Sequence, residues 1–193
     1  MYDEIFMRQA ISLAKSAVEH GNEPFGAVLV RYGEVVYTNE NQIYTRKDPT
    51  FHAELGLLRQ FSEETAVSDL SEYTLYSSCE PCYMCAGAMV WMKLGRLVYG
   101  ASNKELEELL GNEVASECAE TVFANSFWKP RVTGGICRKE SVEVLSAYFA
   151  DHKCILRRRA AAGAVTNGSR AVFSGSETVC GLQRPLSGCK RSV

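Results

Sequence analysis

The stretch "YTLYSSCEPCYMCAGAMVWMKLGRLVYGA", residues 73–101, decides the fold class because it contains a strand, a helix and a second strand. "YTLYSS" at its start and "RLVYGA" at its end are short runs of β-branched, aromatic and apolar residues, which are typical of strands. Pro81 suits the first turn of a helix, where its missing N–H leaves no bond unmade, and that helix should run to about Leu94. Two strands joined through a helix are expected to be parallel neighbours with a right-handed crossover.

The rest of the sequence adds strands and helices around this unit. A first helix is expected from about Asp3 to His20, ended by Gly21. "GAVLVR" and "EVVYTN" should form a hairpin that turns at Tyr32-Gly33. The first helix should bury a stripe made of Ile5, Phe6, Ala10, Ile11, Leu13, Ala14, Ala17 and Val18. Further elements are expected as a polar loop at 42–50, a helix from near Phe51, helices at 103–110 and 115–127, a strand within 131–137 and a last helix at 139–152. We therefore predict an α/β fold of three layers (α/β/α), with a mixed sheet of about five strands.

Composition indicates an ordinary globular protein. The chain has 193 residues, of which 46% are hydrophobic, and this length suits one compact domain. No run approaches the roughly 18 apolar residues that a membrane span requires. The first residues form an amphipathic stretch with early acids, unlike a signal peptide. We expect a cytoplasmic protein whose eight cysteines are reduced.

The charge is distributed unevenly along the chain. Residues 1–154 contain 14 basic and 22 acidic residues, whereas residues 155–193 contain seven basic residues and one acid. We predict a folded domain at 1–154 and a flexible basic tail, rich in Gly, Ser and Arg, at 155–193. An RNA-binding arm and a non-native extension remain alternatives for the tail.

Cysteines at the predicted start of the third helix suggest a metal site. Cys82 and Cys85 are three residues apart, which places both sulfurs on one helix face. A redox dithiol is one alternative, and Cys79 adds an iron–sulfur alternative, but the ferredoxin spacing would need a cysteine where Met89 stands. The decisive addition is "DPTFHAEL" at 48–55, which supplies a His-x-Glu pair. The order His-x-Glu…Pro-Cys-x-x-Cys is the signature of zinc deaminases.

This pattern predicts a catalytic Zn²⁺ centre. His52, Cys82 and Cys85 would supply three ligands and leave the fourth tetrahedral position for water, as in catalytic rather than structural zinc sites. Glu54 would act as the catalytic proton shuttle from that water to the ring nitrogen and the departing amine. Cys79 is interpreted as a small buried residue at the end of a strand.

From about residue 2 to 153, the sequence resembles the cytidine deaminase superfamily, in the purine branch that holds guanine deaminases and tRNA adenosine deaminases. "EPFGAVLV", "DPTFHAE", "LYSSCEPCYMCAGAM" and "RLVYGA" carry the resemblance. It implies the zinc ligands and proton shuttle named above, and it implies that Asn41 hydrogen-bonds the base. Phe25 and Trp91 would close an apolar slot around a flat ring, with packing in the core as the alternative for each, and Ala53 is a further expected substrate contact. The resemblance further implies a homodimer and a C-terminal aromatic residue over the pocket, either Tyr148 or Phe149.

The branch is less clear from the motifs. "PCYMCAGAM" with "GRLVYGA" is similar to the tRNA enzymes, whereas Phe25, Cys79 and Trp91 are similar to the guanine deaminases. The Phe-Asp-Asp segment whose acid binds the guanine edge is missing, and Glu113 or Glu117 would have to replace it. An acidic body disfavours binding to the phosphates of tRNA. We therefore expect a deaminase of a small purine base or nucleoside, with tRNA wobble-adenosine deamination, cytosine deamination and a non-catalytic zinc-stabilised RNA-binding or scaffold protein as alternatives.

Overall fold

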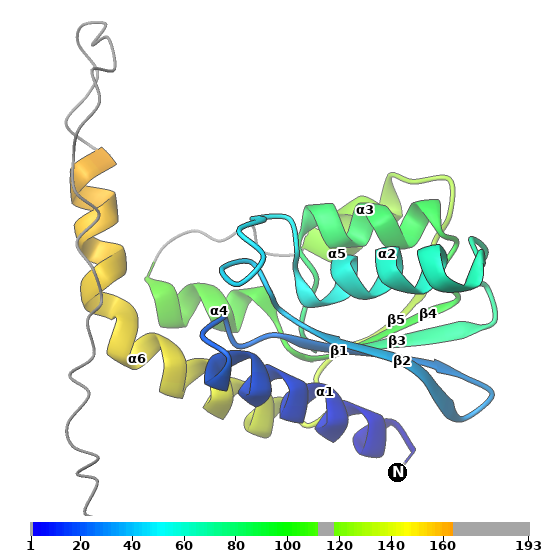
Figure 1. Cartoon of the computed structure of the whole chain (residues 1–193), viewed down its shortest axis with the longest axis horizontal. Helices are drawn as coiled ribbons and strands as arrows, with labels where there is room; N and C mark the ends of the chain where they lie inside the picture. The colour runs from blue at the N-terminus through cyan, green and yellow to red at the C-terminus, as the bar shows by residue number, and fades with distance from the viewer. Residues whose placement is uncertain (1, 112–117, 164–193) are drawn as a thin grey trace, which may run out of the picture.

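The computed structural model describes residues 2–111 and 118–163, with side chains described for 2–111 and 119–150. In chain order the elements are α1 (Tyr2–Glu19), β1 (Gly26–Arg31), β2 (Glu34–Glu40), α2 (Ala53–Thr65), β3 (Tyr73–Cys79), α3 (Tyr83–Trp91), β4 (Arg96–Ala101), α4 (Asn103–Leu110), α5 (Cys118–Ala124), β5 (Arg131–Thr133) and α6 (Arg138–Gly163) (Figure 1).

The five strands form one mixed sheet in the order β2-β1-β3-β4-β5. β1 is antiparallel to both β2 and β3, whereas β3, β4 and β5 are parallel. The hairpin turns at Tyr32 and Gly33, whose φ angles of 52° and 82° both lie in the left-handed region. Two such residues form the turn whose twist matches a two-residue hairpin. The predicted mixed sheet and its β3–α3–β4 unit are confirmed.

Helices cover both faces of the sheet. α1 and α6 lie on one face, and α2, α3 and α5 lie on the other (Figure 1). The larger apolar cluster packs α2 and α3 against the sheet, with Leu57, Leu58, Met89 and Leu97 fully buried. A smaller cluster joins α1 to the opposite face. The three-layer arrangement is thus held together by a separate apolar layer on each side of the sheet.

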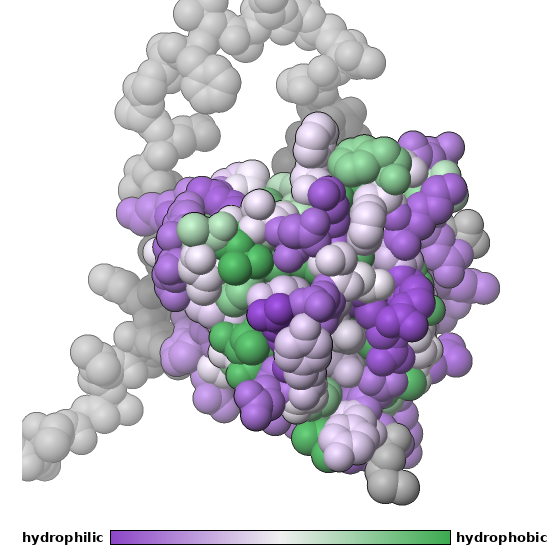
Figure 2. All heavy atoms as spheres, turned by 90° about the vertical axis from the view of Figure 1, so that its right-hand side faces the viewer, coloured by the Kyte–Doolittle hydropathy of each residue, from purple (hydrophilic) through white to green (hydrophobic). Residues whose placement is uncertain are grey.

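Most of the molecular face at the hairpin end of the sheet is polar. Figure 2 shows purple hydrophilic side chains separating small green apolar groups on this face. Within the described residues, no helix combines the length and the apolar character that a membrane crossing would require.

The starts of two helices differ from the prediction. α2 begins at Ala53 with His52 as its N-cap, two residues later than expected. α3 begins at Tyr83 with Cys82 as its N-cap, so Pro81 lies before the helix and not in its first turn. In both cases the N-cap residue has extended backbone angles, so the helix begins one residue after the ligand position. α3 also ends at Trp91 and not at Leu94.

Three further expectations need adjustment. Ile5 and Val18 are exposed, because the buried stripe of α1 runs instead through Met7. The last strand is shorter than predicted, since β5 covers only Arg131–Thr133. α6 continues to Gly163 across the expected boundary at residue 154, so the division into a domain and a tail stays a prediction.

Candidate metal centre

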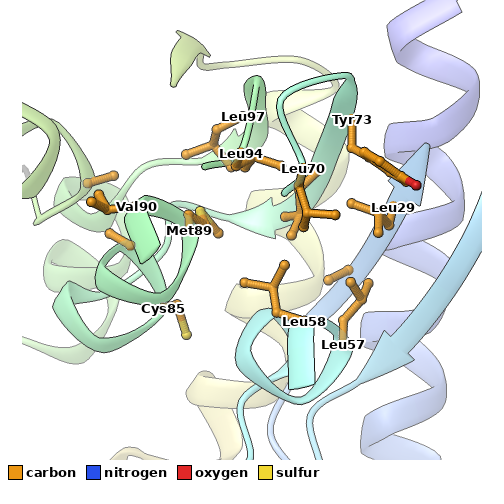
Figure 3. Packing of buried hydrophobic residues seen from close by; sticks show 14 of the residues in the cluster. Leu29, Leu57, Leu58, Leu70, Tyr73, Cys85, Met89, Val90, Leu94 and Leu97 are labelled. Atoms are coloured by element: carbon orange, nitrogen blue, oxygen red, sulfur yellow. The ribbon is translucent and has the colours of Figure 1, made fainter. Parts of the chain in front are cut away.

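The three predicted ligands meet where α2 and α3 begin. His52 is the N-cap of α2, Cys82 is the N-cap of α3, and Cys85 lies in the first turn of α3. Their ligand atoms all lie within 4.8 Å of one another, and Cys82 Sγ is 3.7 Å from His52 Nδ1. Cys85 is fully buried and belongs to the larger apolar cluster (Figure 3). Residues thirty positions apart in the sequence therefore form one group.

This group fits zinc in both spacing and chemistry. Bonds of 2.0–2.1 Å to nitrogen and 2.3 Å to sulfur place neighbouring ligand atoms of a tetrahedral zinc about 3.5–3.8 Å apart. One imidazole and two thiols form a donor set that zinc prefers. Within the described residues, Cys79 lies outside the group and is buried with Ala101, Leu106, Leu145 and Phe149. A three-ligand centre is typical of catalytic zinc.

The local electrostatics favour a thiolate at this position. A hydrogen bond from Cys85, together with the His52 ring, lowers the pKa of Cys82 to about 4. The pKa of Cys85 is raised, mainly by its hydrogen bond with Cys82 and also by burial. Cys82 in turn raises the pKa of His52. The thiolate is the form that binds metal, and the start of α3 adds the partial positive charge of a helix N-terminus.

Glu54 lies beside the ligands in the first turn of α2 and is only 5% exposed. Ser77 Oγ on β3 donates a hydrogen bond of 2.9 Å to Glu54 Oε1. The other oxygen, Oε2, lies 3.6 Å from Cys85 Sγ. Burial raises the pKa of Glu54. A raised pKa suits a carboxyl group that accepts and returns a proton near neutral pH.

Asn41 is fully buried and has an unused hydrogen-bond donor. Its Oδ1 accepts a hydrogen bond of 3.2 Å from the backbone N–H of Ile43. Its Nδ2 has no hydrogen-bond partner among the described residues. Buried polar groups are nearly always paired, and the next residue, Gln42, donates its backbone N–H to Phe51, directly before His52, so the unpaired donor of Asn41 suggests a ligand acceptor.

The other expected substrate contacts are placed differently from one another. Phe25 is half-buried and packs against two apolar clusters, the larger one around α2 and α3 and the one that contains Cys79 and Phe149. Ala53 is fully buried at the start of α2, and its carbonyl accepts a hydrogen bond from Asn39 Nδ2. Trp91 does not join the group, because it ends α3 at 77% exposure and packs edge-on against Phe127.

A sequence profile comparison identifies the family. The profile described as the cytidine and deoxycytidylate deaminase zinc-binding region matches residues 1–101, which contain all three ligands and Glu54. The chain belongs to this family of zinc-binding deaminases. It is therefore a hydrolytic deaminase with zinc as its cofactor.

Two kinds of relative of this deaminase have similar sequence identity. The guanine deaminase of Bacillus subtilis (strain 168) is 37% identical over 109 residues, covering 56% of this chain and 70% of that protein. The tRNA-specific adenosine deaminase of Buchnera aphidicola subsp. Baizongia pistaciae is 35% identical over 148 residues, covering 76% of this chain and 88% of that protein. A solved chain from work on A-to-I editing by tRNA:A34 deaminases aligns with a TM-score of 0.62 and 34% identity, covering 72% of this chain and 97% of that one.

The structure adds residues that the sequence analysis of this deaminase missed. Ser77 orients Glu54, and the signal was available because Ser77 follows Tyr73 and Leu75 at the two-residue period of the buried β3 face. Asn103 is a second buried amide whose Nδ2 is unpartnered among the described residues, and its backbone N–H donates to Glu80 at 3.0 Å. No sequence pattern points to it.

The remaining expectations have mixed outcomes. Of the two aromatic candidates over the pocket, Phe149 is buried in the core at 6% exposure, whereas Tyr148 is partly exposed. Glu113 and Glu117 lie outside the described residues. The homodimer and the cytoplasmic location stay predictions.

Proposed function

We propose that this deaminase hydrolyses the exocyclic amine of a free purine base or nucleoside, with guanine or guanosine favoured, and releases ammonia. The observation that carries this proposal is the fully buried, unpartnered Nδ2 of Asn41. The loop that contains Asn41 is bound to the segment before α2. The backbone N–H of Gln42 donates to the carbonyl of Phe51, which directly precedes His52. An amide donor at this place suits a ring nitrogen or carbonyl oxygen of a base.

The chain's own residues divide the chemistry among them. His52, Cys82 and Cys85 would hold zinc, which when bound is a Lewis acid that makes water a good nucleophile near neutral pH. Glu54 would take a proton from the attacking water and pass it to the ring nitrogen, and then protonate the departing amine. Ser77 holds one oxygen of Glu54, which leaves the other to move the proton. The balanced reaction adds one water across the C–N bond and yields a ring carbonyl and ammonia.

The charge of residues 1–154 supports a small substrate over tRNA. Residues 1–154 contain eight more acidic than basic residues, from the counts of 22 and 14. Tight binding to tRNA depends on basic side chains that neutralise phosphates, so this body favours a small neutral substrate.

Deamination of tRNA adenosine is the second candidate. The Buchnera tRNA-specific adenosine deaminase aligns over more of this chain than the guanine deaminase of Bacillus subtilis does, at 76% against 56%. The basic residues from 155 onward could contribute phosphate contacts that the body lacks.

A substrate panel tests the proposal. Zinc-loaded protein is incubated with guanine, guanosine, adenine, adenosine, cytosine and an anticodon stem-loop, and ammonia release is measured. We expect turnover of a free purine base or nucleoside, and turnover of the stem-loop alone would reject the proposal.

Glu54→Gln should reduce kcat by about 10³-fold or more while retaining zinc, since acid–base catalysis contributes about 10²–10⁴. Glu63→Gln, on the exposed face of the same helix, is the matched control and should retain full activity.

A further inference from the structure

A short turn before β1 is hydrogen-bonded to the loop between β2 and α2. The backbone N–H of Phe25 donates to the carbonyl of Glu23 at 2.8 Å, which closes the turn. Asn22 is almost fully buried, and its Oδ1 accepts hydrogen bonds of 3.1 Å from the backbone N–H groups of Tyr44 and Thr45. The turn is therefore fixed to the loop between β2 and α2.

The same loop connects the turn to the candidate site. Asn41, which has the unpartnered amide, donates its backbone N–H to the carbonyl of Phe25 at 2.9 Å. Gln42 donates its backbone N–H to the carbonyl of Phe51 at 3.1 Å, directly before the ligand His52. Hydrogen bonds thus connect the turn at 22–25 to the loop that follows β2, and that loop to Phe51, the residue before His52.

Glu23 supplies a carboxylate in the turn at 22–25. Its Oε1 accepts a hydrogen bond of 2.9 Å from the hydroxyl of Tyr44, and its side chain is partly exposed. None of the ion pairs among the described residues involves Glu23, so its negative charge has no cation beside it there.

The negative charge of Glu23 also acts on Tyr148 in α6. Burial raises the pKa of Tyr148, and the charge of Glu23 adds to the rise. Glu23 is therefore bound to the loop that precedes the candidate metal centre, and it is close enough to α6 for its charge to act on Tyr148.

A carboxylate here has opposite effects on two classes of purine. It accepts hydrogen bonds from the N–H groups of a base or the hydroxyls of a ribose, whereas it repels a phosphate group. We propose that Glu23 makes this deaminase select uncharged purine bases and nucleosides over their 5′-phosphorylated nucleotides. This inference rests on the proposed function and adds the residue that excludes phosphate.

The test compares two substrates across matched variants. For the purine that turns over in the panel, kcat/KM is measured for the nucleoside and for its 5′-monophosphate with the wild-type protein and with Glu23→Gln. Glutamine can still accept the hydrogen bond from Tyr44, so the substitution removes the charge and keeps the contact. We expect Glu23→Gln to raise the nucleotide-to-nucleoside ratio of kcat/KM about tenfold at low ionic strength, because local charge alters the encounter and binding of charged ligands. The gain should shrink in 0.5 M salt, where charges are screened over about 4–5 Å.

Two further variants separate charge at this position from other causes. Glu34→Gln removes the same charge from an exposed position on β2 and should leave the ratio unchanged. Tyr44→Phe removes the hydrogen bond and keeps the carboxylate, so the nucleotide should still be rejected. An unchanged ratio in Glu23→Gln would overturn the inference and leave the proposed function intact. An equal rise in Glu34→Gln or Tyr44→Phe would also overturn it, and an absence of purine turnover would overturn both proposals.

Discussion

The helices of this deaminase begin in two different ways. At the start of α4, Ser102 and Glu105 form a capping box, in which the Ser102 hydroxyl accepts from the backbone of Glu105 and the Glu105 carboxylate accepts from the backbone of Ser102. At the starts of α2 and α3 the N-cap residues are His52 and Cys82, and neither side chain caps its helix. One kind of start stabilises its own helix, whereas the other presents the side chains predicted to bind zinc.

The difference shows what the metal centre requires from the fold. An N-cap residue has extended backbone angles, and its side chain normally bonds the free N–H groups of the first turn. In α2 and α3 that side chain points to the other ligands instead, so each helix loses a contribution of about 1 kcal/mol. We propose that a zinc ion bound by these side chains would stabilise both helix starts.

Removal of zinc should have the largest effect. Chelation should abolish ammonia release and lower the free energy of unfolding by about 4 kcal/mol, the value expected when the metal is present at 1,000 times its dissociation constant. For a chain of this size that corresponds to about 8–16 °C in Tm. Calorimetry with and without chelator, together with hydrogen exchange of the first turns, measures both effects.

The exchange pattern distinguishes the two kinds of helix start. Amides at the starts of α2 and α3 should lose protection when zinc is removed, whereas those at the start of α4 should not. Equal loss of protection in all three helices would contradict the distinction drawn above.

The helices and strands whose side-chain pattern is local in the sequence could be predicted from it. The hairpin at Tyr32-Gly33 and the β3–α3–β4 unit were predictable because strand alternation and turn residues are local signals. The spacing of His52, Glu54, Cys82 and Cys85 was also a local pattern. That spacing could not show that His52 and Cys82 occupy the N-cap positions of α2 and α3. Pro81 in fact favours an earlier start for α3.

The rest of the site depends on how segments distant in sequence meet. Nothing in the sequence shows which way Trp91 points, and the structure places it at the exposed end of α3, against Phe127. The unpartnered donor of Asn41 is visible only after its neighbours are placed. Glu23 is separated from Tyr44 by the whole β1–β2 hairpin, so the hydrogen bond between them also follows from tertiary structure.

In the first turn of α1, the carboxylate of Asp3 binds side chains of β3 and β4. Asp3 accepts two hydrogen bonds from Arg96, at 2.8 and 2.9 Å, and one from Tyr76 at 2.7 Å. Asp3→Asn should lower the free energy of unfolding by about 2 kcal/mol at pH 7, the range for hydrogen bonds to a charged group. Activity should be retained, because these residues lie on the sheet face opposite α2 and α3.

This loss should depend on pH in a defined direction. The hydrogen bonds from Arg96 hold the pKa of Asp3 below its ordinary value of 3.8. A lowered folded-state pKa stabilises the protein above pH 3.8, and that stabilisation is lost as the pH falls through the lower value. Denaturant unfolding should therefore show the full wild-type advantage at pH 7 and a decreasing advantage as the pH falls below 3.8. Asp69→Asn, which breaks an exposed ion pair with Lys93, is the control and should have a smaller effect.

The smallest expected effect tests the comparison most directly. Ser102→Ala removes the side-chain cap of α4 and should lower the free energy of unfolding by about 1 kcal/mol, or about 2–4 °C in Tm. Ser102→Asp should restore most of this loss, because aspartate is an equally good N-cap. Zinc content and kcat should be unchanged in both variants, and the loss from Ser102→Ala should be the same with and without chelator, since the cap and the metal act on different helices. If Ser102→Ala released zinc or slowed turnover, α4 would belong to the metal centre, and the separation between helix starts that stabilise and helix starts that bind metal would no longer hold.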